Sequence, residues 1–174
     1  AVLTADIVAN ENLIDESGNV SGTPEYTWNG PGRNASSSNC YQGVFDGNGH
    51  IISGLYAPSD RDCCGLFARC NGTIKNLGII DSFFGSSNHY HAASFVGFGD
   101  KNCTIENCFS TATINGEHYC GGIAGETYGK INNCYFMGKI TANNTLSNSI
   151  VSDYYNNGTL ENCYYLKSCG LTTS

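Results

Sequence analysis

Residue types that many globular domains use freely are scarce in this sequence. Only 13% of its 174 residues are charged, three are proline and one is methionine. No apolar run approaches the about 20 residues that a membrane-spanning helix needs. No stretch repeats its apolar residues with the 3.6-residue period of an amphipathic helix. Neither a helical domain nor membrane insertion is therefore expected.

Positive charge is also scarce. The eight Lys and Arg residues are scattered and are outnumbered by fifteen Asp and Glu, which gives a formal net charge of −7. Nucleic acids and anionic membrane surfaces select basic patches, so we expect neither as a partner. The opening segment "AVLTADIVANEN" lacks the basic start and apolar middle of a signal peptide. We expect any export signal to lie outside this sequence.

Cysteine is abundant, with ten residues, but no Cys-x-x-Cys pair occurs. That spacing is the usual one in zinc sites, so its absence argues against a structural metal, and no other cofactor is indicated. Two explanations stay open for the thiols. They could form disulfides in an extracellular setting, or remain free and pack as small hydrophobic side chains.

One short motif recurs along the chain. The stretch "CTIENCFS" at 103–110 has weaker copies in "GTIKNLGI" from Gly72, "GKINNCYF" from Gly129 and "GTLENCYY" from Gly158. Aligned on the apolar centre, with steps of 22, 31, 26 and 29 residues, the register reads Ile52, Ile74, Ile105, Ile131 and Leu160. Periods of this size predict a solenoid.

Two further series accompany the motif. One reads "GLF" at 65–67, "SFV" at 94–96, "GIA" at 122–124 and "SIV" at 149–151, and another is clearest in "STATING" and "MGKITAN". Each repeat thus holds about three short β-type segments separated by Gly, Asn and Ser turns. The sequence predicts an all-β parallel β-helix of about five coils, with repeats over 43–174.

In a β-helix, equivalent residues stack in columns from coil to coil. One position of the repeat predicts a ladder of side-chain amides, each donating to one neighbour and accepting from the other. Its members are Asn76, Asn107, Asn133 and Asn162. The next position reads Leu77, Cys108, Cys134 and Cys163. A column that begins with Leu is expected to face inward and to keep free thiols, with a disulfide between coils as the alternative.

The remaining repeat-region cysteines lie beside strands or on turns and are better disulfide candidates, with a pairing that the sequence does not give. They are Cys63, Cys64, Cys70, Cys103 and Cys120. Residues 1–42 hold no copy of the repeat and are expected to lie across the first coil as a cap, with Tyr26 and Trp28 closing the same end. At the other end, one of Tyr164 and Tyr165 is expected to shield the interior.

Five segments in order along 41–166 resemble the GLUG-repeat family. They read "YQGVFDGNGHIISGLY" (41–56), "GLFARCNGTIKNLGI" (65–79), "CTIENCFSTATING" (103–116), "CGGIAGETYGKINNCY" (120–135) and "GTLENCYYL" (158–166). The family comprises bacterial secreted or cell-surface proteins. The resemblance implies a right-handed β-helix related to pectate lyases, and a role in adhesion or ligand display. It carries over no catalytic residues, and the motif dissolves into "NSIVSD" at 148–153.

A polysaccharide-cleaving β-helix would need carboxylates grouped on one face. The candidates are Asp46, Asp60, Asp62, Asp81, Asp100, Glu106, Glu126, Asp153 and Glu161. Turn chemistry explains the acid in "FDGNGH", and the "DRD" triplet at 60–62 reads as solvated surface. A column that changes from Glu106 to Lys75 between coils is typical of a solvent face.

His89 and His91 would project from the same side of an extended segment, but no third metal ligand is evident, so surface histidines are favoured over a metal site. No Ser-His-Asp or Cys-His grouping can be argued. The long loops at 81–93 and 141–157 are rich in aromatic and amide groups, which bind sugars by stacking and hydrogen bonding. Ligand-binding candidates are His89, Tyr90, His91, Tyr154 and Tyr155. Alternatively, Tyr154 or Tyr155 covers the end of the coil.

The sequence thus favours a non-enzymatic module of an exported bacterial surface protein, in adhesion, glycan or ligand binding, or as a rigid spacer. A polysaccharide lyase or hydrolase acting on the lateral face of the coil is the first alternative. End-to-end self-association into a filament is the second.

Overall fold

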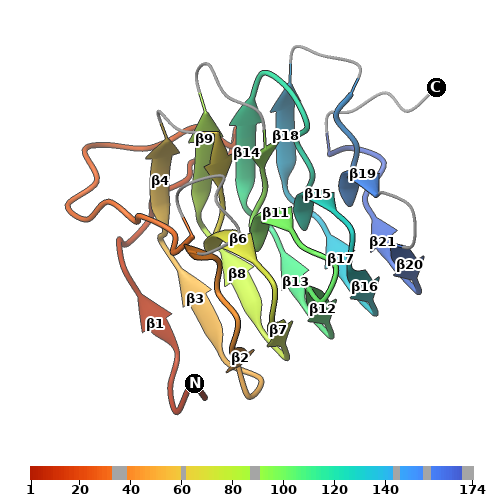
Figure 1. Cartoon of the computed structure of the whole chain (residues 1–174). Coiled ribbons are helices and arrows are strands. Elements are labelled where there is room, and N and C mark those ends of the chain that lie inside the picture. The colour runs from red at the N-terminus through yellow and green to blue at the C-terminus, as the bar shows by residue number, and fades with distance from the viewer. Residues whose placement is uncertain (33–38, 60–61, 87–90, 143–145, 155–157, 170–174) are drawn as a thin grey trace.

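The computed structural model describes residues 1–32, 39–59, 62–86, 91–142, 146–154 and 158–169. Across them the chain winds as a parallel β-helix, in which each short strand pairs in parallel with its counterpart one turn away (Figure 1). These residues contain no α-helix, and accordingly none that is long and apolar enough to cross a membrane. The all-β solenoid predicted from the repeats is confirmed.

The strands form five parallel sheets. The first sheet contains β2 (Val44–Asp46), β7 (Thr73–Lys75), β12 (Thr104–Glu106), β16 (Lys130–Asn132) and β20 (Thr159–Glu161). The second contains β1 (Ile7–Val8), β3 (Ile51–Ser53), β8 (Gly78–Ile80), β13 (Phe109–Ser110), β17 (Tyr135–Phe136) and β21 (Tyr164–Tyr165). The third contains β4 (Tyr56–Ser59), β9 (Phe83–Ser86), β14 (Thr113–Gly116) and β18 (Lys139–Ala142).

The last two sheets close each turn. The fourth pairs β5 (Cys63–Cys64) with β10 (His91–Ala92) and continues through single bridges at Cys120 and Asn148. The fifth contains β6 (Phe67–Cys70), β11 (Val96–Gly99), β15 (Ala124–Thr127) and β19 (Val151–Tyr154). The coil makes four turns and begins a fifth. A full turn therefore crosses five sheets rather than the three segments predicted, because two-residue strands are too short to leave an alternation pattern in sequence.

The predicted register holds along most of the first sheet, where Ile74, Ile105, Ile131 and Leu160 are paired in order. The upstream assignment of Ile52 was wrong. Phe45 pairs with Ile74, while Ile52 belongs to the second sheet and pairs with Ile79. The longer turn "GNGH" between β2 and β3 shifted the alignment, and the aromatic Phe45 takes the inward place that later coils give to Ile.

The interior is filled by columns of apolar side chains. In the first sheet Ile74 and Ile105 are completely buried, and in the third sheet Phe84 and Ile114 are stacked in register and equally buried. Each such side chain contributes about 1.5–3 kcal/mol by leaving water. Cys108 and Cys134 lie in the buried column that Leu77 begins. All ten cysteines are free thiols, including the five that were disulfide candidates.

The described part of the lead-in, residues 1–32 and 39–42, begins along the path of the coil, and its middle then crosses later turns. Thr113 and Lys139 donate side-chain hydrogen bonds to the carbonyls of Gly18 and Ser17. Leu3 donates its backbone N–H to Asp46 at the first sheet, and β1 pairs with β3 in the second. Trp28 then donates its backbone N–H to Tyr56 at the third sheet, and its indole Nε1 to the carbonyl of Leu66 at 3.1 Å. Tyr26 remains 58% exposed, so of the two aromatic residues only Trp28 packs on the core.

The last turn leaves the interior open among the described residues. Leu160 and Tyr165 continue the inward columns of Ile131 and Phe136, yet they are 39% and 44% exposed. Tyr164 is 69% exposed. Tyr165 pairs with the fully buried Phe136, and a ring that shields the interior would keep its own outer face exposed. The expectation that one of the two tyrosines shields the interior therefore stays a prediction.

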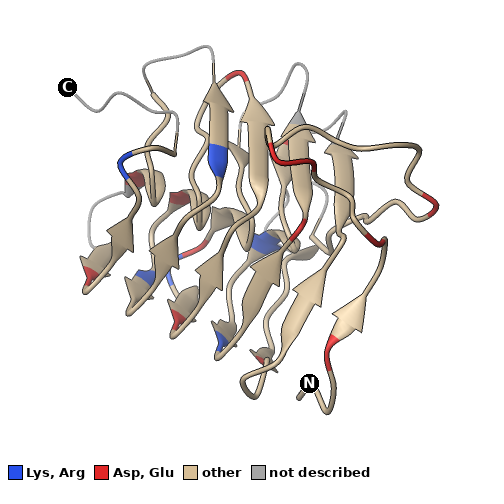
Figure 2. Cartoon of the chain, turned by 180° about the vertical axis from the view of Figure 1, so that it is seen from behind, with Lys and Arg blue, Asp and Glu red and all other residues tan. Residues whose placement is uncertain are grey.

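The first three strands of the first sheet carry charged residues of alternating sign (Figure 2). Asp46, Lys75 and Glu106 are consecutive partners across β2, β7 and β12. The Lys75 Nζ lies 3.5 Å from an Asp46 carboxylate oxygen. Opposite charges on neighbouring strands attract and like charges repel, so this alternation stabilises the register modestly.

Candidate functional site

A cluster of polar and aromatic side chains lies where the fourth and fifth sheets meet. Strand alternation turns Cys64 and Ala92 into the core, so their neighbours Cys63 and His91 point away from it. We call the group formed by Cys63, His91, Phe98, Tyr119 and Glu126 the lateral cluster.

Two glycines of the fifth sheet allow the fourth sheet to approach closely. A β-carbon on Gly97 would lie 3.0 Å from the Cβ of Cys63, and one on Gly125 would lie 3.0 Å from the Cβ of His91. Contacts this short are rarely tolerated, so a side chain at either place would push the two sheets apart. Glycine here brings His91 within reach of Glu126.

The centre of the lateral cluster is a partly buried ion pair. The Nε2 of His91 lies 2.9 Å from a carboxylate oxygen of Glu126, and the side chains are 16% and 7% exposed. Burial on its own would lower the pKa of His91, but hydrogen bonds with Cys63 and Glu126 outweigh it and raise that pKa to about 9. His91 is therefore an imidazolium at neutral pH, and both of its ring nitrogens are donors.

The other ring nitrogen faces a thiol. The Nδ1 of His91 lies 3.7 Å from the Sγ of Cys63 and 3.2 Å from the backbone carbonyl oxygen of Asp62. One N–H is thus shared between a carbonyl and a sulfur. Cys63 and His91 are directly paired residues of β5 and β10, so backbone hydrogen bonding fixes this contact.

Aromatic rings hold the imidazolium in place. Tyr119 stacks on it with ring centroids 5.4 Å apart, and Phe98 meets it edge-on at 5.5 Å. The guanidinium of Arg69 lies 4.8 Å from the centroid of Phe98 and binds both carboxylate oxygens of Asp100, at 2.6 and 2.9 Å. Rings around a cation supply favourable electrostatics while they exclude water.

Cys63, His91 and Glu126 form a linear series of contacts. Cys63 and Glu126 lie on opposite nitrogens of His91, so they cannot converge on one ion. Across the part of the chain that the structure describes, no group of three or more His, Cys, Asp or Glu side chains could hold a metal.

A second polar assembly, the asparagine ladder, lies at the turn between the first and second sheets. Asn162 donates its side-chain amide to Asn133, Asn133 to Asn107 and Asn107 to Asn76, each at 3.1 Å. Asn76 in turn donates to a carboxylate oxygen of Asp46 at 3.0 Å. All four asparagines have φ between 50° and 54°, a left-handed conformation that Asn tolerates better than most residues.

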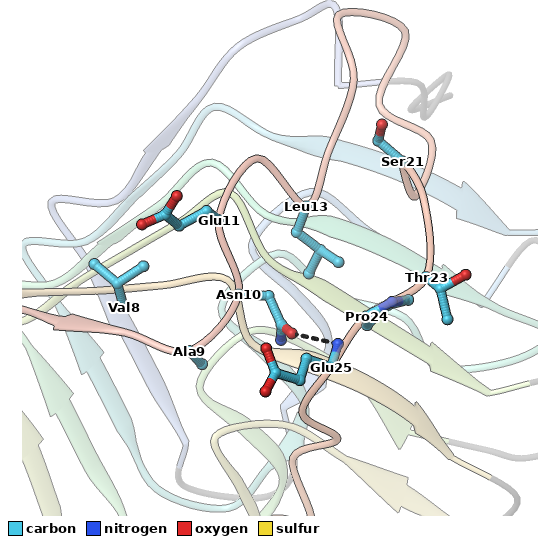
Figure 3. Close-up of a pocket in the computed structure, with 9 residues that line it drawn as sticks. All are labelled: Val8, Ala9, Asn10, Glu11, Leu13, Ser21, Thr23, Pro24 and Glu25. Atoms are coloured by element: carbon cyan, nitrogen blue, oxygen red, sulfur yellow. Dashed lines mark hydrogen bonds between the residues drawn. The ribbon is translucent and has the colours of Figure 1, made fainter.

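A pocket of about 440 Å³ lies in the lead-in, between Val8 and Glu25 (Figure 3). Its fixed point is Asn10, which is 9% exposed. The Asn10 amide donates to the carbonyls of Tyr26 and Gly54, and its oxygen accepts from the backbone N–H groups of Glu25 and Tyr26. With all its hydrogen-bonding capacity used in this way, Asn10 serves to pin the loop rather than to bind a ligand.

Of the residues expected to bind a ligand, His89, Tyr90 and Tyr155 lie outside the described residues. Tyr154 is the last residue of β19. His91 lies in the lateral cluster, bonded to Glu126, and is not a freely exposed surface histidine.

No Cys-His grouping was predicted from the sequence, yet the fold brings Cys63 and His91 together. A correct prediction of the pairing between the strands at 63–64 and 91–92 would have placed these two residues on adjacent turns. The approach of Glu126 from another sheet follows only from the cross-section of the coil, which the repeat does not reveal.

No family model matches the chain, so membership of the GLUG-repeat family stays a prediction. The chain is 27% identical over 169 residues to Halomucin from Haloquadratum walsbyi, a match that covers 77% of this chain but only 2% of Halomucin. Among solved structures, a "putative immunoglobulin A1 protease" from Bacteroides ovatus superposes with a TM-score of 0.54 at 18% identity. That match covers 96% of this chain and 68% of the other. At such low identity, the likeness shows a shared β-helical fold alone.

Proposed function

We propose that this chain is a β-helical module of a longer exported surface protein, where the rigid coil serves adhesion or ligand display without catalysis. The observation that carries the proposal is the open last turn. Leu160 and Tyr165 belong to inward columns but remain exposed, and among the described residues no donor reaches the side-chain oxygen of Asn162. A further coil stacked there would bury both columns and extend the ladder.

The comparison with Halomucin supports the same proposal. The matched segment is a small fraction of that protein, in keeping with one module among many. In such a protein the stacked columns supply stiffness, and the outer side chains and loops are free to vary. Localisation outside the cell is part of this proposal.

A glycan array tests adhesion directly. We expect saturable binding to at least one glycan class, weakened by Tyr154→Ala at the end of β19 or by Tyr164→Ala at the open end. Glu106→Lys on the outer face of the first sheet serves as the matched control and should bind as the wild type does. An array without any binding would remove adhesion and leave the spacer role.

End-to-end association is a second candidate, favoured by the same open turn. The opposite end also exposes apolar side chains, with Val2 63% and Val8 60% exposed. Sedimentation at rising concentration should then show oligomers that Tyr165→Lys abolishes. A monomer at every concentration would exclude this candidate.

Polysaccharide cleavage on the lateral face remains the competing enzymatic proposal, and it has less support. Glu126 and Asp153 are neighbours in register on the fifth sheet, but the carboxylate of Glu126 is bonded to His91 and is only 7% exposed. Incubation with acidic polysaccharides, with and without calcium, should release no reducing ends or unsaturated products. Their release would overturn the non-enzymatic proposal.

A further inference from the structure

We propose that Cys63, His91 and Glu126 form a nucleophilic thiol site on the side of the coil, which exchanges with low-molecular-weight disulfides to give a mixed disulfide at Cys63. The inference goes beyond the display role proposed above and is independent of it. It rests on the order of the three groups: a thiol beside one nitrogen of an imidazole, and a carboxylate on the other.

Access separates Cys63 from most of the other thiols. Seven of the ten cysteines are buried, and the three that are partly exposed are Cys40, Cys63 and Cys163. Only these three thiols are therefore accessible to a reagent in water while the protein is folded.

The surroundings then distinguish Cys63 from Cys163. The thiol of Cys163 lies 3.2 Å from the carbonyl oxygen of Glu161 and 3.6 Å from that of Ile131. Hydrogen bonding with Cys134 and burial raise the pKa of Cys163, so it keeps its proton. Cys40 accepts a long contact of 3.8 Å from the amide of Gln42 and, like Cys63, interacts electrostatically with Arg69. Cys63 has, in addition, a charged imidazolium nitrogen 3.7 Å away.

Glu126 makes this geometry persistent. Its bond to Nε2 fixes the plane of the ring and keeps the imidazolium charged, while Tyr119 covers one face of the ring. An N–H group carrying positive charge is thereby aimed toward the sulfur on which negative charge develops during attack. Nucleophile, partner and orienting carboxylate are the three parts that activated cysteines share.

Several charged and polar groups surround the His91 ring and contribute to its electrostatic environment. The carboxylate of Glu126 offsets the charge of His91 directly. Arg69, on the far side of Phe98, adds a positive charge that Asp100 largely compensates. The carbonyl of Asp62 shares the Nδ1 proton with Cys63. No second thiol is needed for the reaction that we propose.

The exchange step is balanced without an external oxidant. The sulfur of Cys63, as thiolate, attacks one sulfur of the small disulfide. A new Cys63–sulfur bond forms as the old sulfur–sulfur bond breaks, and the departing thiolate takes up the proton that Cys63 lost. One thiol and one disulfide give one mixed disulfide and one thiol.

Oxidised glutathione is the probe for the test, with the rate measured at each cysteine by peptide mass spectrometry on the folded wild-type chain between pH 6 and 8. We expect Cys63 to form the mixed disulfide at least about tenfold faster than Cys163 or Cys40. In His91→Gln the rate at Cys63 should fall about tenfold, toward that of Cys40. The buried thiols Cys103 and Cys134 report folding in the same experiment, because they react only if a variant unfolds.

The outcomes separate clearly. Equal rates at Cys63, Cys40 and Cys163 in the wild type would overturn the proposal whatever the variants do. An unchanged rate at Cys63 in a folded His91→Gln variant would show that the imidazolium does not activate the thiol. Rapid alkylation of Cys63 by iodoacetamide without any mixed disulfide would refute the disulfide as its substrate.

Discussion

The turn between the first and second sheets repeats asparagine at four successive levels, whereas the outer corner between the fourth and fifth sheets places a different residue at each level. The first builds a uniform chain of amides from Asn76 to Asn162. The second stacks Cys63, His91 and Tyr119 on one side and sets Glu126 against them from the other.

This difference separates two uses of the same architecture. Identical residues in register can form the same hydrogen bonds at every turn, so the ladder adds stability with each turn and its members have similar surroundings. Unlike residues in register meet only once, so the lateral cluster creates a local environment that no other level shares. In a solenoid, chemistry is therefore expected where the repeat is broken.

The largest loss of stability should come from a substitution in the interior, against which both corners pack. Ile105 is fully buried between Ile74 and Ile131, so Ile105→Asp places an uncompensated charge in the core and should cost more than about 4 kcal/mol of unfolding free energy. The adjacent Glu106 points outward, so Glu106→Lys should change the free energy of unfolding by less than about 1 kcal/mol. Urea unfolding of the two variants measures the contrast, and equal midpoints would contradict the assignment of inward and outward faces.

The next largest effect distinguishes the lateral cluster from ordinary surface charge. Glu126→Gln leaves the His91 imidazolium without its buried counter-charge and should destabilise the fold by on the order of 3 kcal/mol at pH 7. Glu161→Gln is the matched control, since Glu161 is exposed in the last turn. Thermal unfolding should show a clear loss for the first variant only. A small effect from both would mean that the ion pair is no stronger than a surface pair.

The two corners should also respond to opposite ends of the pH scale. The pKa of His91 is raised to about 9, so its contribution is complete below the unfolded value of about 6.5 and disappears as pH rises through 9. The pKa of Asp46 is lowered, chiefly by the hydrogen bond from Asn76, so its contribution disappears as pH falls below the usual value for Asp. Between pH 6 and 10, the stability gap between wild type and His91→Gln should shrink by about 3 kcal/mol. A constant gap would exclude the raised pKa.

Sequence reasoning succeeded where the molecule repeats and failed where it does not. Ile74, Ile105 and Ile131 could be aligned because each coil restates the same local pattern. Ile52 could not be placed correctly, because the preceding turn has two extra residues and an aromatic residue stands where the others have Ile. The contact of His91 with Glu126 could not be predicted from the sequence, because it depends on how closely two sheets approach at Gly125.

The smallest expected effect tests whether the ladder is as uniform as its geometry. Glycine retains the left-handed backbone conformation, so Asn107→Gly and Asn162→Gly remove the amide without straining the turn. Asn107 bonds to both Asn76 and Asn133, whereas among the described residues the Asn162 side chain bonds only to Asn133. We expect a loss of about 1 kcal/mol for the first variant and about half of that for the second, measured by chemical unfolding. Equal losses would show that each rung acts alone. A larger loss at the open end would show that the last turn depends on its amide more than on its exposed side chains, and would weaken the inference that a further coil belongs there.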